Sequence, residues 1–220
     1  MLKLADFDAV IFDMDGLVLD TESTYIIAWQ QAGNAMGYDF SDDFCLSLSG
    51  CHYKDVELRL IEYCGAEFNL QTFNRLSSDF WREYVDIHGI KIKHGFFELL
   101  ELLIRQKIPY CMATNSPAEN ALECLELAGI EELFSIVVTR EQVRHGKPEP
   151  DIFLKAAELM QVDISRCLVI EDSLAGIVAA SRAGAMTVLV PSTVQIDPLA
   201  IELCNLMVSD LEQLTNMIRA

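Results

Sequence analysis

Short apolar runs alternate with helical stretches along most of this sequence, and no other feature constrains its fold as strongly. The runs are mostly rich in β-branched or aromatic residues, which is typical of strands that are buried on both faces. Helical stretches between them end before glycines such as Gly129 and Gly184, where a left-handed residue often closes a helix. This alternation predicts an α/β fold with a mainly parallel sheet. The five predicted strands are Ala9–Phe12, Tyr110–Ala113, Ile136–Val138, Cys167–Ile170 and Thr187–Val190.

One long segment, residues 21–89, breaks this alternation because it reads as helix after helix without a convincing strand. We expect it to be a helical cap inserted into an α/β catalytic core of residues 1–20 and 90–220. Because the insertion directly follows the first strand, it would lie above the carboxyl end of that strand, where open α/β sheets bind ligands. The expected apolar anchors of the cap are Trp29, Phe44, Leu58, Ile61, Phe73, Phe80 and Trp81.

Composition and charge exclude several classes of protein. Hydrophobic residues make up 51% of the 220 residues, which is enough to bury a core. A formal net charge of -18 would repel the phosphate backbone of a nucleic acid, so no nucleic-acid partner is expected. No apolar run is long enough to span a membrane and no secretory leader is visible, so we expect a soluble, cytoplasmic protein. The seven cysteines are scattered without CxxC spacing, which favours neither disulfides nor a zinc site.

The first predicted strand ends in two acids, Asp13 and Asp15, which are followed by Gly16. Side chains two positions apart in an extended chain share a face, and the glycine lets the backbone turn sharply. Both carboxylates can therefore approach one small ligand, and they would repel each other unless a cation or a proton intervened. Taken alone, the motif could equally be an acidic turn without a function.

Two later segments carry groups that suit a phosphate ester. Thr114, Asn115 and Ser116 follow the second strand and precede a helix, where hydroxyl and N–H groups can bind phosphate oxygens or simply cap the helix. Lys147 lies in Gly146-Lys147-Pro148-Glu149-Pro150-Asp151, before another helix. In so acidic a chain, its charge could offset that of a phosphoryl group and of a nucleophile.

A third segment places Glu171 and Asp172 directly after the strand Cys167–Ile170. Hard carboxylate oxygens at the end of a buried strand suit Mg²⁺, which takes one or two protein carboxylates and keeps several waters. The alternative is a capping role at the next helix, which Asp172 or Ser173 could serve.

The four segments DMDGLVLD, ATNS, GKPEPD and EDSLAGIVAASRAG, in this order, resemble the haloacid dehalogenase superfamily, and in particular its members with a helical cap after the first motif. The resemblance covers nearly the whole chain. It implies a Rossmann-like core, a nucleophile at Asp13 that forms an aspartyl-phosphate, and an acid at Asp15 that protonates the leaving oxygen and then activates water. The implied Mg²⁺ ligands are Asp13, the backbone carbonyl of Asp15, Asp172, and Glu171 either directly or through water. The implied phosphate-positioning residues are Thr114, Asn115 and Lys147.

The resemblance implies a Mg²⁺-dependent phosphatase that hydrolyses a small phosphomonoester, with sugar phosphates as one candidate class. Asp15 speaks against dehalogenation, because dehalogenases of this family use no second acid. A β-phosphoglucomutase-like sugar phosphate mutase is the closest alternative. Two departures weaken it: Tyr25 stands where those mutases carry a cap histidine, and residues 50–54 lack their arginine. A phospho-accepting signalling receiver is the alternative from another class, but the helical insertion fits a hydrolase better.

The insertion is also expected to select the substrate, since it would close over the site and exclude water. His52 and Lys54 are the candidate substrate-selecting residues. Surface histidines and lysines on polar loops usually carry no such role, so the sequence leaves this assignment open. The expected partner is a small-molecule phosphate ester.

Overall fold

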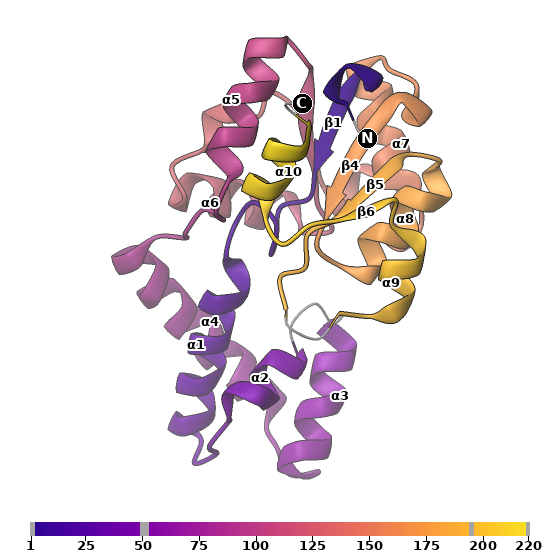
Figure 1. Cartoon of the computed structure of the whole chain (residues 1–220). Coiled ribbons are helices and arrows are strands. Elements are labelled where there is room, and N and C mark those ends of the chain that lie inside the picture. Colours follow the sequence, from indigo (N-terminus) through magenta and orange to yellow (C-terminus); the bar gives the residue numbers. More distant parts are fainter. Residues whose placement is uncertain (1–2, 49–52, 194–195, 219–220) are drawn as a thin grey trace. The chain divides into compact units, whose positions relative to one another are not determined.

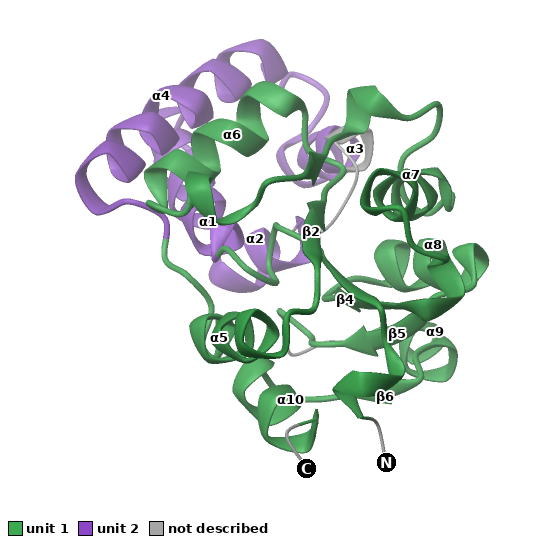
Figure 2. Ribbon diagram, turned by 90° about the horizontal axis from the view of Figure 1, so that it is seen from above, with its two compact units in different colours: residues 1–19, 91–220 green, residues 20–90 purple. Residues whose placement is uncertain are grey.

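The computed structural model of this chain describes residues 3–48, 53–193 and 196–218. It divides into two compact units, one of residues 1–19 and 91–220 and one of residues 20–90 (Figure 2). These limits lie one residue away from those expected for the core and the cap. The roles of catalytic core and cap stay predictions.

The first unit is built on a parallel sheet with the strand order β3-β2-β1-β4-β5-β6, of which Figure 1 labels β1, β4, β5 and β6. This confirms the predicted α/β fold. The order reverses between β1 and β4, and open sheets of this kind bind ligands at such a switch point. The strands are β1 (Ala9–Phe12), β2 (Tyr110–Ala113), β3 (Val137–Val138), β4 (Cys167–Glu171), β5 (Met186–Leu189) and β6 (Leu206–Met207).

Helices cover both faces of this sheet. Along β1, Ala9 and Ile11 face a core built with α7 and α8, whereas Phe12 turns to the other face and meets Phe96 of α5 edge to face. The helices of this unit are α5 (Phe96–Gln106), α6 (Ala118–Leu127), α7 (Asp151–Met160), α8 (Leu174–Ala183), α9 (Pro198–Leu203) and α10 (Leu211–Ile218). Short 3₁₀ helices occur at η1 (Leu4–Asp6), η2 (Glu131–Leu133), η3 (Arg140–Gln142) and η4 (Ile164–Arg166).

The sequence predicted five strands and missed a sixth, β6. The strand β6 is only two residues long, and a pair such as Leu206 and Met207 carries no periodicity that distinguishes it from a loop. The limits of β1 and β2 match the predicted ones, β3 and β4 differ from theirs by one residue at one end, and β5 is shifted by one residue at both ends.

The second unit consists of the helices α1 (Thr21–Ala35), α2 (Asp42–Leu48), α3 (Tyr53–Cys64) and α4 (Leu70–His88). Its core gathers aromatic and aliphatic side chains from all four helices, including Phe73 of α4. The expectation for Leu58 was wrong, because this side chain is 59% exposed on α3. Val56 and Leu60, which lie one helical turn apart, supply the inward face of that helix instead. Among the described residues, no helix of either unit has the length and apolar character needed to cross a membrane.

Candidate active site

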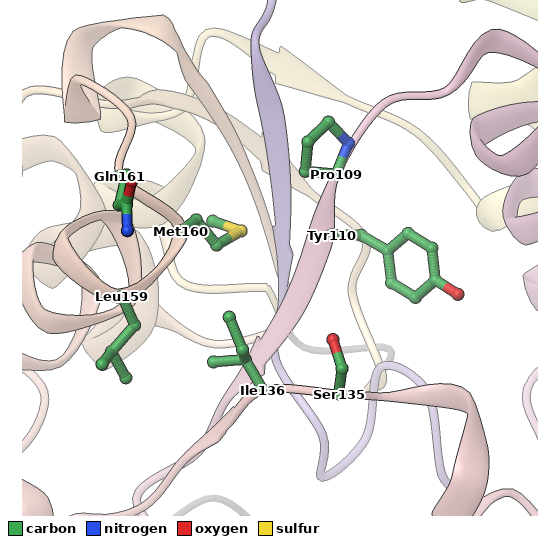
Figure 3. Close-up of a pocket in the computed structure, with 7 residues that line it drawn as sticks. All are labelled: Pro109, Tyr110, Ser135, Ile136, Leu159, Met160 and Gln161. Atoms are coloured by element: carbon green, nitrogen blue, oxygen red, sulfur yellow. The ribbon is translucent and has the colours of Figure 1, made fainter.

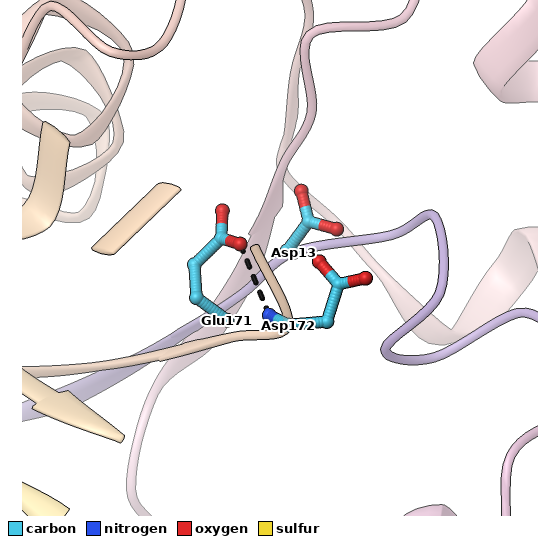
Figure 4. Close-up of side chains that lie close together, drawn as sticks. All are labelled: Asp13, Glu171 and Asp172. Carbon is cyan, nitrogen blue, oxygen red and sulfur yellow. Dashed lines mark hydrogen bonds between the residues drawn. The ribbon is translucent and has the colours of Figure 1, made fainter. Parts of the chain in front are cut away.

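Three acids meet at the switch point between β1 and β4. Asp13 follows β1, Glu171 ends β4 and Asp172 follows it, so the parallel strands bring all three to one edge of the sheet. Each offers an oxygen, and these oxygens lie within 4.8 Å of one another (Figure 4). The backbone N–H of Asp13 donates to the carbonyl of Ile170 at 3.0 Å, which fixes the two strand ends together.

Lys147 brings the balancing charge to this cluster. Its side chain is 4% exposed, and its Nζ donates to Asp13 Oδ1, to Glu171 Oε1 at 2.5 Å and to the carbonyl oxygen of Ala113 at 2.9 Å. An ammonium group has three protons to donate, so these three contacts use all of them. The lysine comes from the segment between η3 and α7, 134 residues after Asp13 in the chain.

The charges at this site do not balance, because three carboxylates lie close together while the ammonium group of Lys147 contacts two of them. Burial, together with the neighbouring charge of Glu171, raises the pKa of Asp13 to about 8. Burial lowers the pKa of Lys147, but the charges of Asp13 and Glu171 outweigh that effect and hold this pKa above its usual value. A site with surplus negative charge and carboxylate donors fits a hard divalent cation such as Mg²⁺.

Glu171 is engaged at both of its oxygens. While Oε1 accepts from Lys147, Oε2 accepts from the backbone N–H groups of Asp172 at 3.1 Å and Ser173 at 3.3 Å, and from the Ser173 hydroxyl at 3.1 Å. A Cβ atom on Gly176 would lie 1.8 Å from Glu171 Cδ, so only glycine leaves room for this carboxylate. A direct bond from Glu171 to a metal would have to compete with these contacts. Ser173, not Asp172, caps α8, by accepting from the Gly176 N–H at 3.1 Å.

Asp15 is held apart from the cluster of three acids. Its Oδ2 accepts from the Thr114 hydroxyl at 3.1 Å and from the Ser116 hydroxyl at 2.8 Å. Thr114 is buried at the end of β2, and its Oγ1 also accepts from the Ser116 N–H at 3.0 Å. Ser116 was absent from the predicted site residues, although its hydroxyl in the same Thr-Asn-Ser turn was a visible signal. The structure therefore brings Asp13, Asp15, Thr114, Lys147, Glu171 and Asp172 to one edge of the sheet, and adds Ser116.

The predicted substrate-selecting residues are not placed at a site. His52 lies outside the described residues, and Lys54 belongs to α3 but its side chain is likewise outside what the structure describes. Within the second unit, Tyr25 stacks against Trp29 with ring centroids 6.1 Å apart and against Trp81 at 5.6 Å. The selecting roles of His52 and Lys54 stay predictions.

A separate hollow of about 380 Å³ lies at the opposite edge of the sheet, where β2 begins (Figure 3). Neither a carboxylate nor a cationic side chain lines it, so it does not offer the groups that a phosphate ester or a metal ion needs. Its lining residues are Pro109, Tyr110, Ser135, Ile136, Leu159, Met160 and Gln161.

We expect Asp13→Asn to stabilise the metal-free protein increasingly as the pH rises. Burial and the charge of Glu171 raise the pKa of Asp13 to about 8 in the folded protein, from its ordinary value of 3.8 in the unfolded chain. Between these values the unfolded chain releases a proton that the folded protein keeps, so the free energy of unfolding falls with rising pH. The variant escapes this loss, and at about pH 8 its Tm with chelator should exceed that of the unmodified protein by roughly 3 to 6 °C. Thermal unfolding from about pH 5 to pH 8 measures the difference.

Asp8→Asn is the matched control, because Asp8 is exposed and lies just before β1. Its hydrogen bond and ion pair with Arg166 lower the pKa of its carboxyl, so its replacement should give no gain that grows toward pH 8. A Tm difference for Asp13→Asn that stays flat with pH would contradict the raised pKa.

The fold and the site together define an α/β enzyme with an acidic, lysine-containing centre at the switch point of its sheet. Residues 10–190 match the family of haloacid dehalogenase-like hydrolases. A phosphorylated carbohydrates phosphatase from Thermotoga maritima is 32% identical over 178 residues, which cover 80% of this chain and 82% of that protein. A β-phosphoglucomutase from Bacillus subtilis is 30% identical over 186 residues, with 82% and 81% covered. The crystal structure of a candidate β-phosphoglucomutase from Thermotoga maritima matches with a TM-score of 0.82 and 28% identity, covering 96% of this chain and 98% of that one.

The chain therefore belongs to the haloacid dehalogenase-like hydrolase family. It is a phosphoric monoester hydrolase of the haloacid dehalogenase superfamily. The resemblance noted from the four motifs is confirmed.

Proposed function

We propose that this enzyme is a Mg²⁺-dependent phosphatase that hydrolyses a small phosphomonoester of the sugar phosphate class through an aspartyl-phosphate at Asp13. The observation that carries this proposal is the buried contact between Asp13, Lys147 and Glu171 at the switch point of the sheet. A carboxylate at the end of β1, beside a fixed ammonium group, is suited to attack a phosphoryl group whose own charge the lysine offsets. The relative that acts on phosphorylated carbohydrates supports the substrate class.

The reaction needs two displacements at phosphorus. In the first, a carboxylate oxygen of Asp13 attacks phosphorus, the bond to the ester oxygen breaks, and Asp15 gives that oxygen a proton. In the second, Asp15 takes a proton from water, the water oxygen attacks phosphorus, and the bond to Asp13 breaks to release inorganic phosphate. Thr114 and Ser116 hold the Asp15 carboxylate by hydrogen bonds at 3.1 and 2.8 Å and so orient the proton donor.

Asp13 and Asp172 would hold the cation, together with the backbone carbonyl of Asp15. Glu171 would hold Lys147 and the turn after β4 in place, because it accepts hydrogen bonds from both. When bound, Mg²⁺ would offset the negative charge of Asp13 and of the phosphoryl oxygens and would favour the ionised form of the nucleophile.

We expect chelation to abolish phosphate release and Mg²⁺ to restore it. Asp172→Asn should raise the Mg²⁺ concentration for half-maximal rate by roughly 10- to 100-fold, because a neutral amide is a weaker ligand for a hard cation. A Mg²⁺ titration of the rate measures this. Asp163→Asn removes the same charge from an exposed position before β4 and should leave the titration unchanged. An Asp172→Asn titration that coincides with that of the unmodified enzyme would exclude Asp172 as a ligand.

Two observations favour the mutase alternative, the 30% identity to the Bacillus subtilis β-phosphoglucomutase and the structural match to the candidate β-phosphoglucomutase from Thermotoga maritima. Tyr25 weakens it, because this residue stands where those mutases carry a cap histidine and its ring stacks against Trp29 and Trp81. Incubation with a hexose 1-phosphate separates the two functions. A phosphatase releases inorganic phosphate, whereas a mutase accumulates the 6-phosphate isomer.

A phosphate-release screen tests the proposed function directly. It would cover sugar phosphates, nucleotides and other small monoesters, with and without Mg²⁺, and would be repeated with Asp13→Asn. Release from sugar phosphates that requires both Mg²⁺ and Asp13 is the expected result. Release that is unaffected by the substitution would refute the proposed nucleophile. The cytoplasmic location and the closing of residues 21–89 over the site stay predictions.

A further inference from the structure

The side-chain amide of Asn115 makes two hydrogen bonds to the backbone of Lys147. Its Nδ2 donates to the Lys147 carbonyl oxygen at 3.1 Å, and its Oδ1 accepts from the Lys147 N–H at 2.8 Å. The amide therefore pairs with this residue much as a neighbouring strand would, across 32 positions of sequence. Each polar atom of the amide thus makes one bond to the Lys147 backbone, and the predicted contact with phosphate would have to use the second N–H of Nδ2.

The segment that ends at Lys147 is held at further points. Arg140 donates to the carbonyl oxygens of Val143 at 3.1 Å and Arg144 at 3.4 Å. The space around Gly146 is filled as well, since a Cβ atom there would lie 2.5 Å from Asn115 Oδ1 and 2.8 Å from Arg140 Cδ. Asn115 and Arg140 thus enclose the glycine that precedes the lysine.

The last residue of β2 and the turn after it hold Lys147 both at its ammonium group and at its backbone. The Ala113 carbonyl accepts from Nζ at 2.9 Å, while Asn115, two residues further on, fixes the main chain. The side chain between them is 4% exposed, so it has little freedom to correct a shift of its backbone. A displacement of about 1 Å at a group that offsets developing charge can cost on the order of 10²-fold in rate.

We propose that Asn115 is a positioning residue, which fixes the backbone of Lys147 and thereby places the ammonium group beside Asp13 and Glu171. This inference rests on the proposed function, because it takes Lys147 as the group that offsets phosphoryl charge. It gives Asn115 a role other than the predicted one of phosphate ligand, which stays a prediction.

Steady-state kinetics of Asn115→Ala with p-nitrophenyl phosphate give the first test. We expect kcat to fall roughly 10- to 100-fold while KM changes less than about threefold, since a displaced ammonium group loses more of its effect on the charge that develops in the transition state than on the binding of the substrate. Asn115 is exposed, so the Tm should stay close to that of the unmodified enzyme. Gln106→Ala truncates an exposed amide at the end of α5 and should change neither constant.

A double-mutant cycle with Lys147→Met gives the second test, with the affinity for inorganic phosphate by calorimetry as a readout besides turnover. If Asn115 acts through Lys147, Asn115→Ala should change the residual kcat and the phosphate affinity less than about twofold once the lysine is absent. If circular dichroism shows that Lys147→Met does not fold, Lys147→Gln replaces it, because an amide can still bond to the two carboxylates.

The outcomes are distinguishable. An equal loss from Asn115→Ala in both backgrounds would identify Asn115 as a phosphate ligand and overturn the inference. Wild-type kcat for Asn115→Ala with a damaged Lys147→Met would overturn the inference alone. Wild-type kcat for Lys147→Met would remove the role of the lysine in the proposed function, and the inference with it.

Discussion

Replacing Asp13 by asparagine should lower the rate of phosphate release by roughly 10⁴-fold or more, the largest effect expected of any single substitution in this chain. An amide has nearly the shape of the carboxylate but cannot attack phosphorus, so the covalent route is closed. The protein should remain folded, because the amide relieves the crowding of Asp13 with Glu171 and Asp172. Phosphate release with saturating Mg²⁺ and a sugar phosphate measures the loss.

Asp8→Asn again serves as the matched control, since it makes the same chemical change just before β1 and outside the site. Mass spectrometry after an acid quench adds an independent readout. The unmodified enzyme should carry a phosphoryl group on the peptide that contains Asp13, and the asparagine variant should not. A variant that retains more than about 1% of the rate would show that another group is the nucleophile.

The sequence alone predicted the sheet and its acidic edge because both depend on local patterns. The limits of β1 and β2 are those of apolar runs, and parallel strands necessarily bring their carboxyl ends to the same edge. Asp13, Thr114 and Glu171 follow or end such runs, so their meeting could be anticipated. The strand order, and with it the switch point between β1 and β4, came only from the structure.

The hydrogen-bond partner of each side chain could not be predicted, because these bonds join residues that lie far apart in the chain. Asn115 and Ser116 stand next to each other in a turn that suits phosphate, yet one pairs with the Lys147 backbone and the other with Asp15, 101 residues away. A sequence motif fixes which groups are available near a strand end. Which hydrogen bond each group makes depends on side-chain directions that only the packed fold determines.

The two oxygens of Glu171 show the same limit. Its residue type and its place after an apolar run predict a metal ligand, and that role stays a prediction. What the sequence did not show is that Glu171 is buried and that its Oε2 accepts from the N–H groups of the following turn. Gly176, in the first turn of α8, makes this arrangement possible because it leaves room for the carboxylate. In the sequence alone, nothing distinguishes Gly176 from the other small residues of this helix.

Asp15→Asn should separate the two chemical steps, because its effect depends on the leaving group. With a sugar phosphate, whose alkoxide is a poor leaving group, the rate should fall roughly 10²- to 10⁴-fold, since no acid protonates the departing oxygen. With p-nitrophenyl phosphate the leaving phenolate needs little help, so Asp13 should still be phosphorylated quickly. The phosphorylated enzyme should then persist, because Asp15 is also the base that activates water.

A stopped-flow trace should accordingly show a burst of about one equivalent of nitrophenolate per active site, followed by slow turnover. Mass spectrometry of the quenched variant should find most of the protein heavier by one phosphoryl group. The position of Asp15 supports these steps, because Thr114 and Ser116 fix its carboxylate while leaving it outside the cluster that surrounds Lys147. Equal losses with both substrates and no burst would show that Asp15 is neither the acid nor the base, and its two hydroxyl partners would then serve only the shape of the turn after β2.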